Sequence, residues 1–290
     1  MPNATQIMRN GSRLLAARDK LFAGQDAGFR ALLRAEIDAS WRRSMAHGVR
    51  PDRFGVPAVE AAPRADVLLL AAGPVADAVG TDLAGTGVSL LVSDQGACII
   101  DRRVPDAGLR TRLDRIGLAP GFHYGEEAVG TTAISVALQR RGPALVAAGE
   151  HYSDTLTPMV CAAAPVSDPQ TGRVLGTVGL ACLAGAASPL MVALVKRAAR
   201  DIEQRLADGV GRPAGDGAGY GASSGWDSLT AAERGVAAII AEGATNREAA
   251  AQLYLSRHTI DFHLRQIFRK LGVTSRVELT RLVLTRGALD

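Results

Sequence analysis

Cysteine is scarce in this sequence, and its few cysteines are not arranged for a metal centre or a disulfide framework. Only three occur in 290 residues, Cys98, Cys161 and Cys182, and they lie far apart without metal-ligand spacing. An odd number of dispersed cysteines is typical of reduced thiols in a cytosol. We therefore predict three buried thiols that pack as small hydrophobic side chains, with no metal and no cofactor.

A secretory signal and a membrane span are also missing. The N-terminus is basic but lacks the apolar core and the small-residue cleavage site of a signal peptide. The uncharged stretch Val174 to Val195 is long enough to cross a bilayer, but Gly176, Gly179 and Gly185 interrupt it and Ser188-Pro189 starts a helix inside it. We expect a buried strand followed by an amphipathic helix, in a cytoplasmic protein with no membrane partner.

One segment has almost no large apolar side chains. Glycine and small polar residues fill the stretch between Leu206 and Trp226, which cannot bury enough apolar surface to offset the entropy lost on ordering. This composition predicts a flexible linker between two domains. The predicted division is an N-terminal arm at 1–27, a large domain at 28–207, a linker at 208–225 and a small domain at 226–290.

Periodicity in the large domain predicts helices first and then mainly short strands. The helices are expected at 5–22, 28–47, 126–138 and 189–206. The strands are expected at 88–93, 98–102, 144–148, 161–166 and 174–182. Glycine-containing loops at 94–96 and 168–172 indicate antiparallel pairing of their neighbours, so we expect an α+β domain with an antiparallel sheet flanked by helices. The apolar stripe from Leu190 to Leu206 packs on that sheet or serves self-association.

Helix-capping signals are dense in the small domain. Capping boxes begin helices at Thr230, Thr245 and Ser275, a further cap stands at Ser256, and glycines mark the helix ends. These signals predict four helices, at 231–242, 246–253, 257–271 and 276–286. Only three residues join the second helix to the third, which is the tight connection of a helix-turn-helix. The small domain is therefore expected to be an all-α, four-helix module.

The third of these helices concentrates positive charge that the whole chain lacks. The chain has a formal net charge of only +4. Between Arg257 and Lys270, however, four Lys or Arg stand against Asp261 alone. Apolar residues recur on one side of this helix, so the other side presents a basic face. Because arginine forks fit guanine edges and phosphates, this face predicts binding to double-stranded DNA.

The small domain resembles the LuxR/GerE helix-turn-helix family along its whole length, from Leu229-Thr230 through Lys270-Leu271-Gly272-Val273 to Ser275-Arg276. The resemblance implies that Asp261, Phe262 and Arg265 lie at base edges, with Thr259, Lys270 and Arg276 near phosphates. With the exposed face added, the predicted DNA-contact residues are Ser256, His258, Thr259, Asp261, Phe262, Arg265, Arg269, Lys270 and Arg276. The family often has lysine where this chain has Asp261, so no consensus operator is transferred.

A second resemblance covers residues 28 to 205, which are similar to the GAF sensor domain of acetoin- and glycerol-catabolism activators. It is carried by Ser40-Trp41-Arg42-Arg43-Ser44, by the stretch from Gly121 to Leu138, and by Gly149-Glu150-His151-Tyr152. It implies a small apolar cavity that binds an effector. The candidate ligand contacts are Tyr124, Glu126, Thr131, Thr132, His151 and Cys161. As structural alternatives, Glu126 and Thr131 cap helices and His151 is a core histidine.

These features together predict a ligand-responsive transcriptional regulator and not an enzyme. It would act as a homodimer on an operator and, because it lacks the ATPase domain of the activators it resembles, would influence RNA polymerase by ordinary contact. One alternative is redox, metal or gas sensing by the same regulator, through its cysteines or through a cluster of His123, Glu126, Glu150, His151 and Cys161. A remote alternative is a thiol enzyme of the GAF fold with Cys98 or Cys161 as nucleophile.

Overall fold

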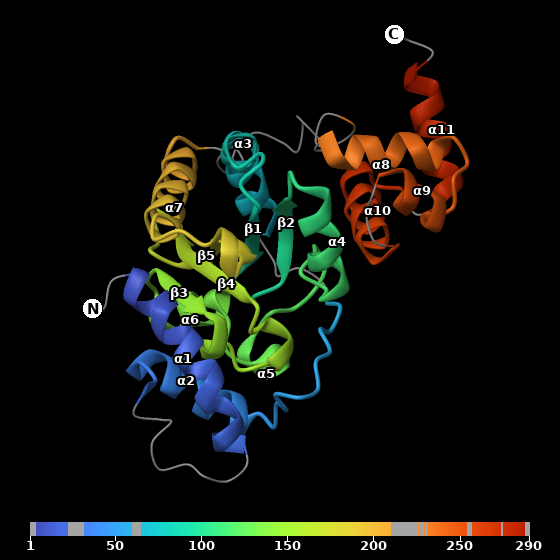
Figure 1. The fold of residues 1–290 in the computed structure, drawn as a ribbon. Coiled ribbons are helices and arrows are strands. Elements are labelled where there is room, and N and C mark those ends of the chain that lie inside the picture. Colours follow the sequence, from blue (N-terminus) through green and yellow to red (C-terminus); the bar gives the residue numbers. More distant parts are fainter. Residues whose placement is uncertain are drawn as a thin grey trace. The chain divides into compact units, whose positions relative to one another are not determined.

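The computed structural model contains two compact units, Met1–Arg212 and Pro213–Asp290 (Figure 1). It describes residues 4–22, 32–59, 65–209, 226, 229, 231–253, 257–273 and 275–287. The first unit is an α+β domain, as predicted, and the elements described in the second unit are all helices. No helix in the described ranges is long and apolar enough to cross a membrane.

A five-stranded antiparallel sheet forms the centre of the first unit, with strand order β2-β1-β5-β4-β3. The strands are β1 (Val88–Asp94), β2 (Ile99–Arg103), β3 (Ala144–Ala147), β4 (Met159–Ser167) and β5 (Val174–Leu183). The two predicted hairpins, β1–β2 and β4–β5, are confirmed. In β5, Gly176 pairs with Asp94 on one side and Val166 on the other, so backbone crowds it from both neighbouring strands.

Helices α3 (Ala65–Asp82) and α7 (Met191–Ala207) lie side by side over one face of this sheet (Figure 1). Arg205 in the last turn of α7 donates from Nε to the Ala71 carbonyl of α3 at 3.0 Å. The apolar stripe predicted for α7 is shifted by one position at its start: Met191 is buried, whereas Leu190 is 72% exposed. The reason is that the helix begins at Met191, with Ser188 Oγ accepting from the Leu190 N–H before it.

Several helices and 3-10 turns cover the opposite face of the sheet. These are α1 (Ala4–Phe22), α2 (Ala35–Ala46), α4 (Ala107–Arg115), α5 (Glu126–Val129), α6 (Ala133–Arg140) and the 3-10 turns η2 (Ala148–Glu150) and η3 (Asp154–Leu156), while a third 3-10 turn, η4 (Ala184–Ala186), follows β5. Leu14 of α1 and Trp41 of α2 pack in one buried cluster, and Leu113 of α4 and Tyr124 belong to another. Both faces of the sheet are therefore covered, and every residue of strand β1 is buried.

Three expectations for this unit are wrong. The single helix predicted over 126–138 is two helices, because Gly130 has φ +78° and Thr132 starts the second with a capping box to Ser135. Helices α3 and α4 were not expected among the strands. The helix predicted from Gly28 begins at Ala35, and residues 23–31 lie outside the described part of the chain.

The second unit has the predicted four helices, α8 (Ala231–Ala241), α9 (Asn246–Gln252), α10 (Arg257–Leu271) and α11 (Arg276–Gly287). The capping box of Thr245 and Glu248 is present, and the Glu278 N–H donates to Ser275 Oγ at 3.2 Å. The predicted caps Thr230 and Ser256 lie outside the described residues. The core is apolar, with Val236, Ile240, Ile260, Ile267 and Leu279 each at most 1% exposed.

Candidate ligand cavity and DNA-binding helix

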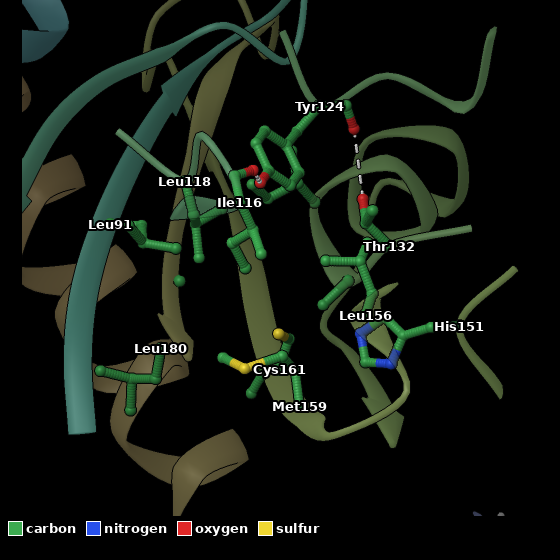
Figure 2. A pocket seen from close by; sticks show the side chains of 14 residues that line it. Leu91, Ile116, Leu118, Tyr124, Thr132, His151, Leu156, Met159, Cys161 and Leu180 are labelled. Atoms are coloured by element: carbon green, nitrogen blue, oxygen red, sulfur yellow. Dashed lines mark hydrogen bonds between the residues drawn. The ribbon is translucent and has the colours of Figure 1, made fainter. Parts of the chain in front are cut away.

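A small apolar cavity of about 20 Å³ lies in the first unit, between β4 and the segments around α6 (Figure 2). Its wall consists of Leu91, Ile116, Leu118, Tyr124, Thr132, Ala133, Ile134, His151, Leu156, Met159, Cys161, Ala162, Gly179 and Leu180. Because a cavity needs roughly 10–15 Å³ to hold one water molecule, a cavity of this volume suits a very small ligand. Most of the side chains in the wall are aliphatic, so a bound ligand would contact only a few polar groups of the protein.

Four of the six predicted ligand contacts line this cavity: Tyr124, Thr132, His151 and Cys161. The Tyr124 hydroxyl donates to the Ile116 carbonyl at 2.7 Å, and Thr132 Oγ1 donates to the Tyr124 carbonyl at 3.2 Å. Burial raises the pKa of Tyr124 well above its ordinary value, so the phenol stays protonated. The hydrogen bonds of Tyr124 and Thr132 orient the polar part of the wall.

The other two candidates, Glu126 and Thr131, form a separate buried cluster with α2. Ser40 Oγ donates to Glu126 Oε1 at 2.5 Å and lies 2.7 Å from Thr131 Oγ1. Arg43 Nε donates to Glu126 Oε2 at 2.5 Å. A buried carboxylate needs such a partner, because an unpaired charge in the interior is costly. The sequence showed both halves of this cluster, but the pairing spans more than eighty positions and has no local signal.

The three thiols are poor nucleophiles in this fold. Burial raises the pKa of Cys98 to about 12, with help from the nearby Asp94 carboxylate, and burial raises the pKa of Cys182 to about 11. The pKa of Cys161 is raised as well, chiefly by burial. Because the thiolate is the reactive form, all three cysteines should react slowly at neutral pH.

We expect Ellman's reagent at pH 8 to label the native chain far more slowly than the urea-unfolded chain. A pKa of about 11 in place of the ordinary 9.0 leaves roughly 100-fold less thiolate at Cys182, and the other two thiols are shifted further. The measurement is the rate of absorbance increase in both states. A cysteine of the native chain that reacts within seconds, identified with single Cys→Ser variants, would contradict the burial of that thiol.

The residues proposed for a metal cluster do not converge. His123 Nε2 lies 2.6 Å from Glu127 Oε1, Glu150 binds Arg34, and Glu126 binds Arg43. Among the side chains that the structure describes, no three His, Cys, Asp or Glu are grouped as metal ligands.

The DNA-contact prediction falls on α10 and its surroundings. Ile260, Leu264 and Ile267 of α10 are buried against the rest of the unit, as predicted. Most of the predicted contacts lie outside the described residues or have side chains outside them, namely Ser256, His258, Thr259, Asp261, Phe262, Arg265 and Arg269.

Two predicted phosphate contacts are described, and both make internal contacts. Lys270 Nζ binds both carboxylate oxygens of Glu233 in α8, at 2.7 and 2.8 Å, with only 14% of the lysine side chain exposed. Arg276 donates to Asn246 Oδ1 and to the Ala244 carbonyl, which joins α11 to the α8–α9 loop. These contacts were not foreseen from the sequence, because they link helices far apart in the chain.

Two family models match the chain. The model "MimR, N-terminal domain" matches residues 16–204, and "Bacterial regulatory proteins, luxR family" matches residues 227–283. The propane 2-monooxygenase operon transcriptional activator MimR of Mycolicibacterium goodii is 38% identical over 167 residues, which are 58% of this chain and 29% of that protein. A nitrate/nitrite response regulator homolog of Haemophilus influenzae is 50% identical over 56 residues, 19% of this chain and 27% of that protein.

The first unit also has a counterpart of known structure. The crystal structure of the E. coli DhaR(N)-DhaL complex contains a chain that matches with a TM-score of 0.57 and 23% identity, over 61% of each chain. This likeness shows a shared fold. The present chain spans less than a third of the length of the MimR activators it matches. The matched families and relatives are transcriptional regulators and not enzymes, and the chain belongs to the MimR N-terminal domain family, with a luxR-family helix-turn-helix domain at its C-terminal end.

Proposed function

We propose that this chain is an effector-responsive transcriptional regulator, in which the first unit binds a small molecule and the second unit binds an operator. The observation that carries the proposal is a small apolar cavity in a chain that also has a DNA-binding domain. The first unit is interpreted as a GAF-type sensor. The regulator would act in the cytoplasm as a homodimer and would influence RNA polymerase by contact.

The effector is proposed to be a mostly apolar molecule of a few heavy atoms. The cavity volume limits its size, and the aliphatic wall favours hydrocarbon over charge. Tyr124, Thr132, His151 and Cys161 are the proposed contacts, with Glu126 and Thr131 supporting the site through α2. The similarity to the activator of a propane 2-monooxygenase operon supports a role in the control of catabolic genes.

DNA contact is proposed through the exposed side of α10. The predicted residues are those of the sequence analysis, Arg265 among them. Phosphate contacts should make the affinity fall steeply with salt, because each neutralised phosphate releases counterions. A dimer would present two such helices to half-sites about one helical turn apart.

Sensing through a thiol or a metal has less support. The raised pKa values should slow any reaction of the cysteines at neutral pH, and three of the five residues proposed as metal ligands, His123, Glu126 and Glu150, pair with other side chains. The same argument applies to a thiol enzyme.

The effector site is tested by thermal shift with short alcohols and short ketones. A ligand at a hundredfold excess over its Kd stabilises the native state by about 2.7 kcal/mol, which is a shift of roughly 5–10 °C for a domain of this size. Cys161→Leu, which fills the cavity, should abolish the shift, and Cys161→Ala, which enlarges it, should keep the shift. Because both variants lack the thiol, an equal loss in both would point to thiol chemistry instead, and an equal shift in both would place the ligand elsewhere.

A further inference from the structure

The turn at residues 147–151 touches the cavity on one side and two helices on the other. His151 at its end is fully buried and lines the cavity, with Nδ1 3.2 Å from the Ala148 carbonyl. Ala148 has φ +47°, a left-handed conformation that is unfavourable for a residue with a Cβ. Such a conformation persists only where surrounding contacts impose it. The contacts that impose it come from α2 and α1.

Arg34, directly before α2, holds this turn in place through Glu150. Both Arg34 Nε and Arg34 Nη2 donate to the Glu150 carboxylate at 2.8 Å, and Nη2 also donates to the Leu145 carbonyl at 2.5 Å. Glu150 Oε2 accepts in addition from the Ala147 N–H at 3.1 Å. Glu150 is 1% exposed, so separating it from Arg34 would leave a buried charge without a partner. The turn and the start of α2 must therefore move together.

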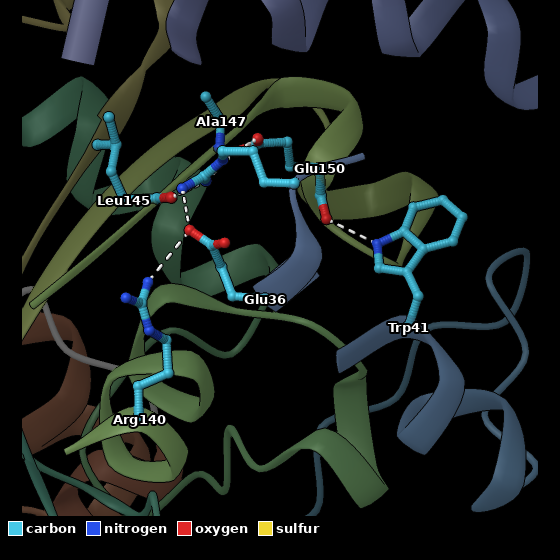
Figure 3. A network of polar contacts seen from close by, with 7 residues as sticks. Glu36, Trp41, Arg140, Leu145, Ala147 and Glu150 are labelled. Atoms are coloured by element: carbon cyan, nitrogen blue, oxygen red, sulfur yellow. Dashed lines mark hydrogen bonds and ion pairs between the residues drawn. The ribbon is translucent and has the colours of Figure 1, made fainter. Parts of the chain in front are cut away.

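Trp41 adds a second connection between the turn and α2. Its indole Nε1 donates to the Glu150 carbonyl at 2.9 Å (Figure 3), and its ring meets that of Tyr152 edge-on at 5.2 Å. The connection to α1 is one of direct backbone contact. A Cβ at Gly149 would lie 2.4 Å from the Leu15 nitrogen, and one at Gly11 would lie 2.6 Å from the Ala147 oxygen. No side chain separates α1 from the turn at these points.

We propose that Arg34 and Glu150 are positioning residues of the effector site, which hold the 147–151 turn so that filling the cavity beside His151 displaces α2 and α1 with it. The proposal rests on the proposed function for the existence of an effector. The three residues of the Gly149-Glu150-His151 sequence then have separate roles. Gly149 allows the backbone of α1 to approach closely, Glu150 binds Arg34 before α2, and His151 lines the cavity.

Xenon serves as the probe, since it enters dry apolar cavities without hydrogen bonding. The full chain has two tryptophans and five histidines, so indole ¹⁵N and histidine ¹³C labels give few NMR signals. Rising xenon pressure should shift the His151 signal and, with the same saturation, the Trp41 indole signal. The Trp226 indole, in the other unit, should not shift. Cys161→Leu should remove both shifts.

The role of the ion pair is tested with the double variant Arg34→Met/Glu150→Gln, which removes both charges but keeps an acceptor for the Ala147 N–H. We expect the His151 shift to remain and the Trp41 shift to become smaller, because only the direct hydrogen bond from Trp41 Nε1 to the Glu150 carbonyl is left to transmit it. The single variant Arg34→Lys keeps the positive charge beside Glu150 but loses the two-pronged contact, so it should also reduce the Trp41 shift and serves if the double variant does not fold. Arg140→Met is the matched control, because it breaks the 3.1 Å contact with Glu36 and leaves the turn untouched.

The outcomes separate this proposal from the proposed function. A His151 shift without a Trp41 shift in the natural chain would overturn the coupling and leave the effector site standing. A double variant with an unchanged Trp41 shift would overturn the role of Arg34 and Glu150. No His151 shift at any xenon pressure would overturn the cavity as a binding site, and this proposal with it.

Discussion

Gly176→Ala is expected to unfold the first unit or to destabilise it by about 3 kcal/mol or more, at the upper end of overpacking substitutions. A Cβ at this position would lie 1.9 Å from the Ser93 carbonyl oxygen, 2.7 Å from Leu68 Cδ2 and 2.9 Å from Asp94 Cα. Two of these atoms belong to the backbone of β1, so no rotamer change relieves the overlap. Strand β5 would have to leave β1 at the centre of the sheet.

Urea unfolding of the full chain, followed by circular dichroism, measures this effect. The chain provides graded controls in the same region. Gly185→Ala should be nearly neutral, because nothing lies within 4 Å of the added Cβ, and Gly179→Ala should be intermediate, because its Cβ would lie 3.1 Å from the Ala162 oxygen. Equal stability of all three variants would mean that the β1–β5 register is not the one described.

Lys270→Met is expected to destabilise the DNA-binding unit itself, and not only to weaken its contact with DNA. Lys270 forms a largely buried ion pair with Glu233, which is 3% exposed. Removing one partner of a buried pair costs about 3–5 kcal/mol, because it leaves the other charge unpaired. Glu233→Gln, at a position the family resemblance does not bring near DNA, should therefore lower both the melting temperature and the DNA affinity in the same way. The double variant Lys270→Met/Glu233→Met should recover much of the stability.

The alternative is a phosphate contact at Lys270, and it gives the opposite pattern. Lys270→Met would then weaken binding, reduce the slope of affinity against salt by about one counterion, and leave the melting temperature unchanged. Glu233→Gln would have no effect. Arg265→Ala is the reference for a residue proposed to touch bases, with lost operator binding and unchanged melting.

Local signals account for most of what could be predicted from the sequence. Capping boxes such as Thr245 with Glu248 act within one turn, so the four helices of the second unit could be located closely. Helix α3 was not predicted because its own sequence is apolar on most sides and contains Pro74. It therefore lacks the one-sided apolar periodicity that identifies a surface helix. The break at Gly130 escaped because glycine is also tolerated inside helices.

In the candidate site, too, the long-range contacts could not be predicted from the sequence. Tyr124, Thr132, His151 and Cys161 line one cavity. They were chosen from the resemblance to a known sensor domain, and residue type alone would not have selected them. The partners of Glu126 and Glu150 lie 83 and 116 positions away in sequence, at Arg43 and Arg34. No periodicity or spacing rule relates positions so distant, so the ion pairs that join α2 to these two buried carboxylates emerged only from the structure.

The bond between Arg205 and α3 determines where the polypeptide leaves the first unit. Pro74 has no N–H to give the Leu70 carbonyl, and one residue further on the Ala71 carbonyl accepts from Arg205 at the end of α7. The last turn of α7 is thus held by a hydrogen bond to the middle of α3, so this helix end is fixed to a second helix.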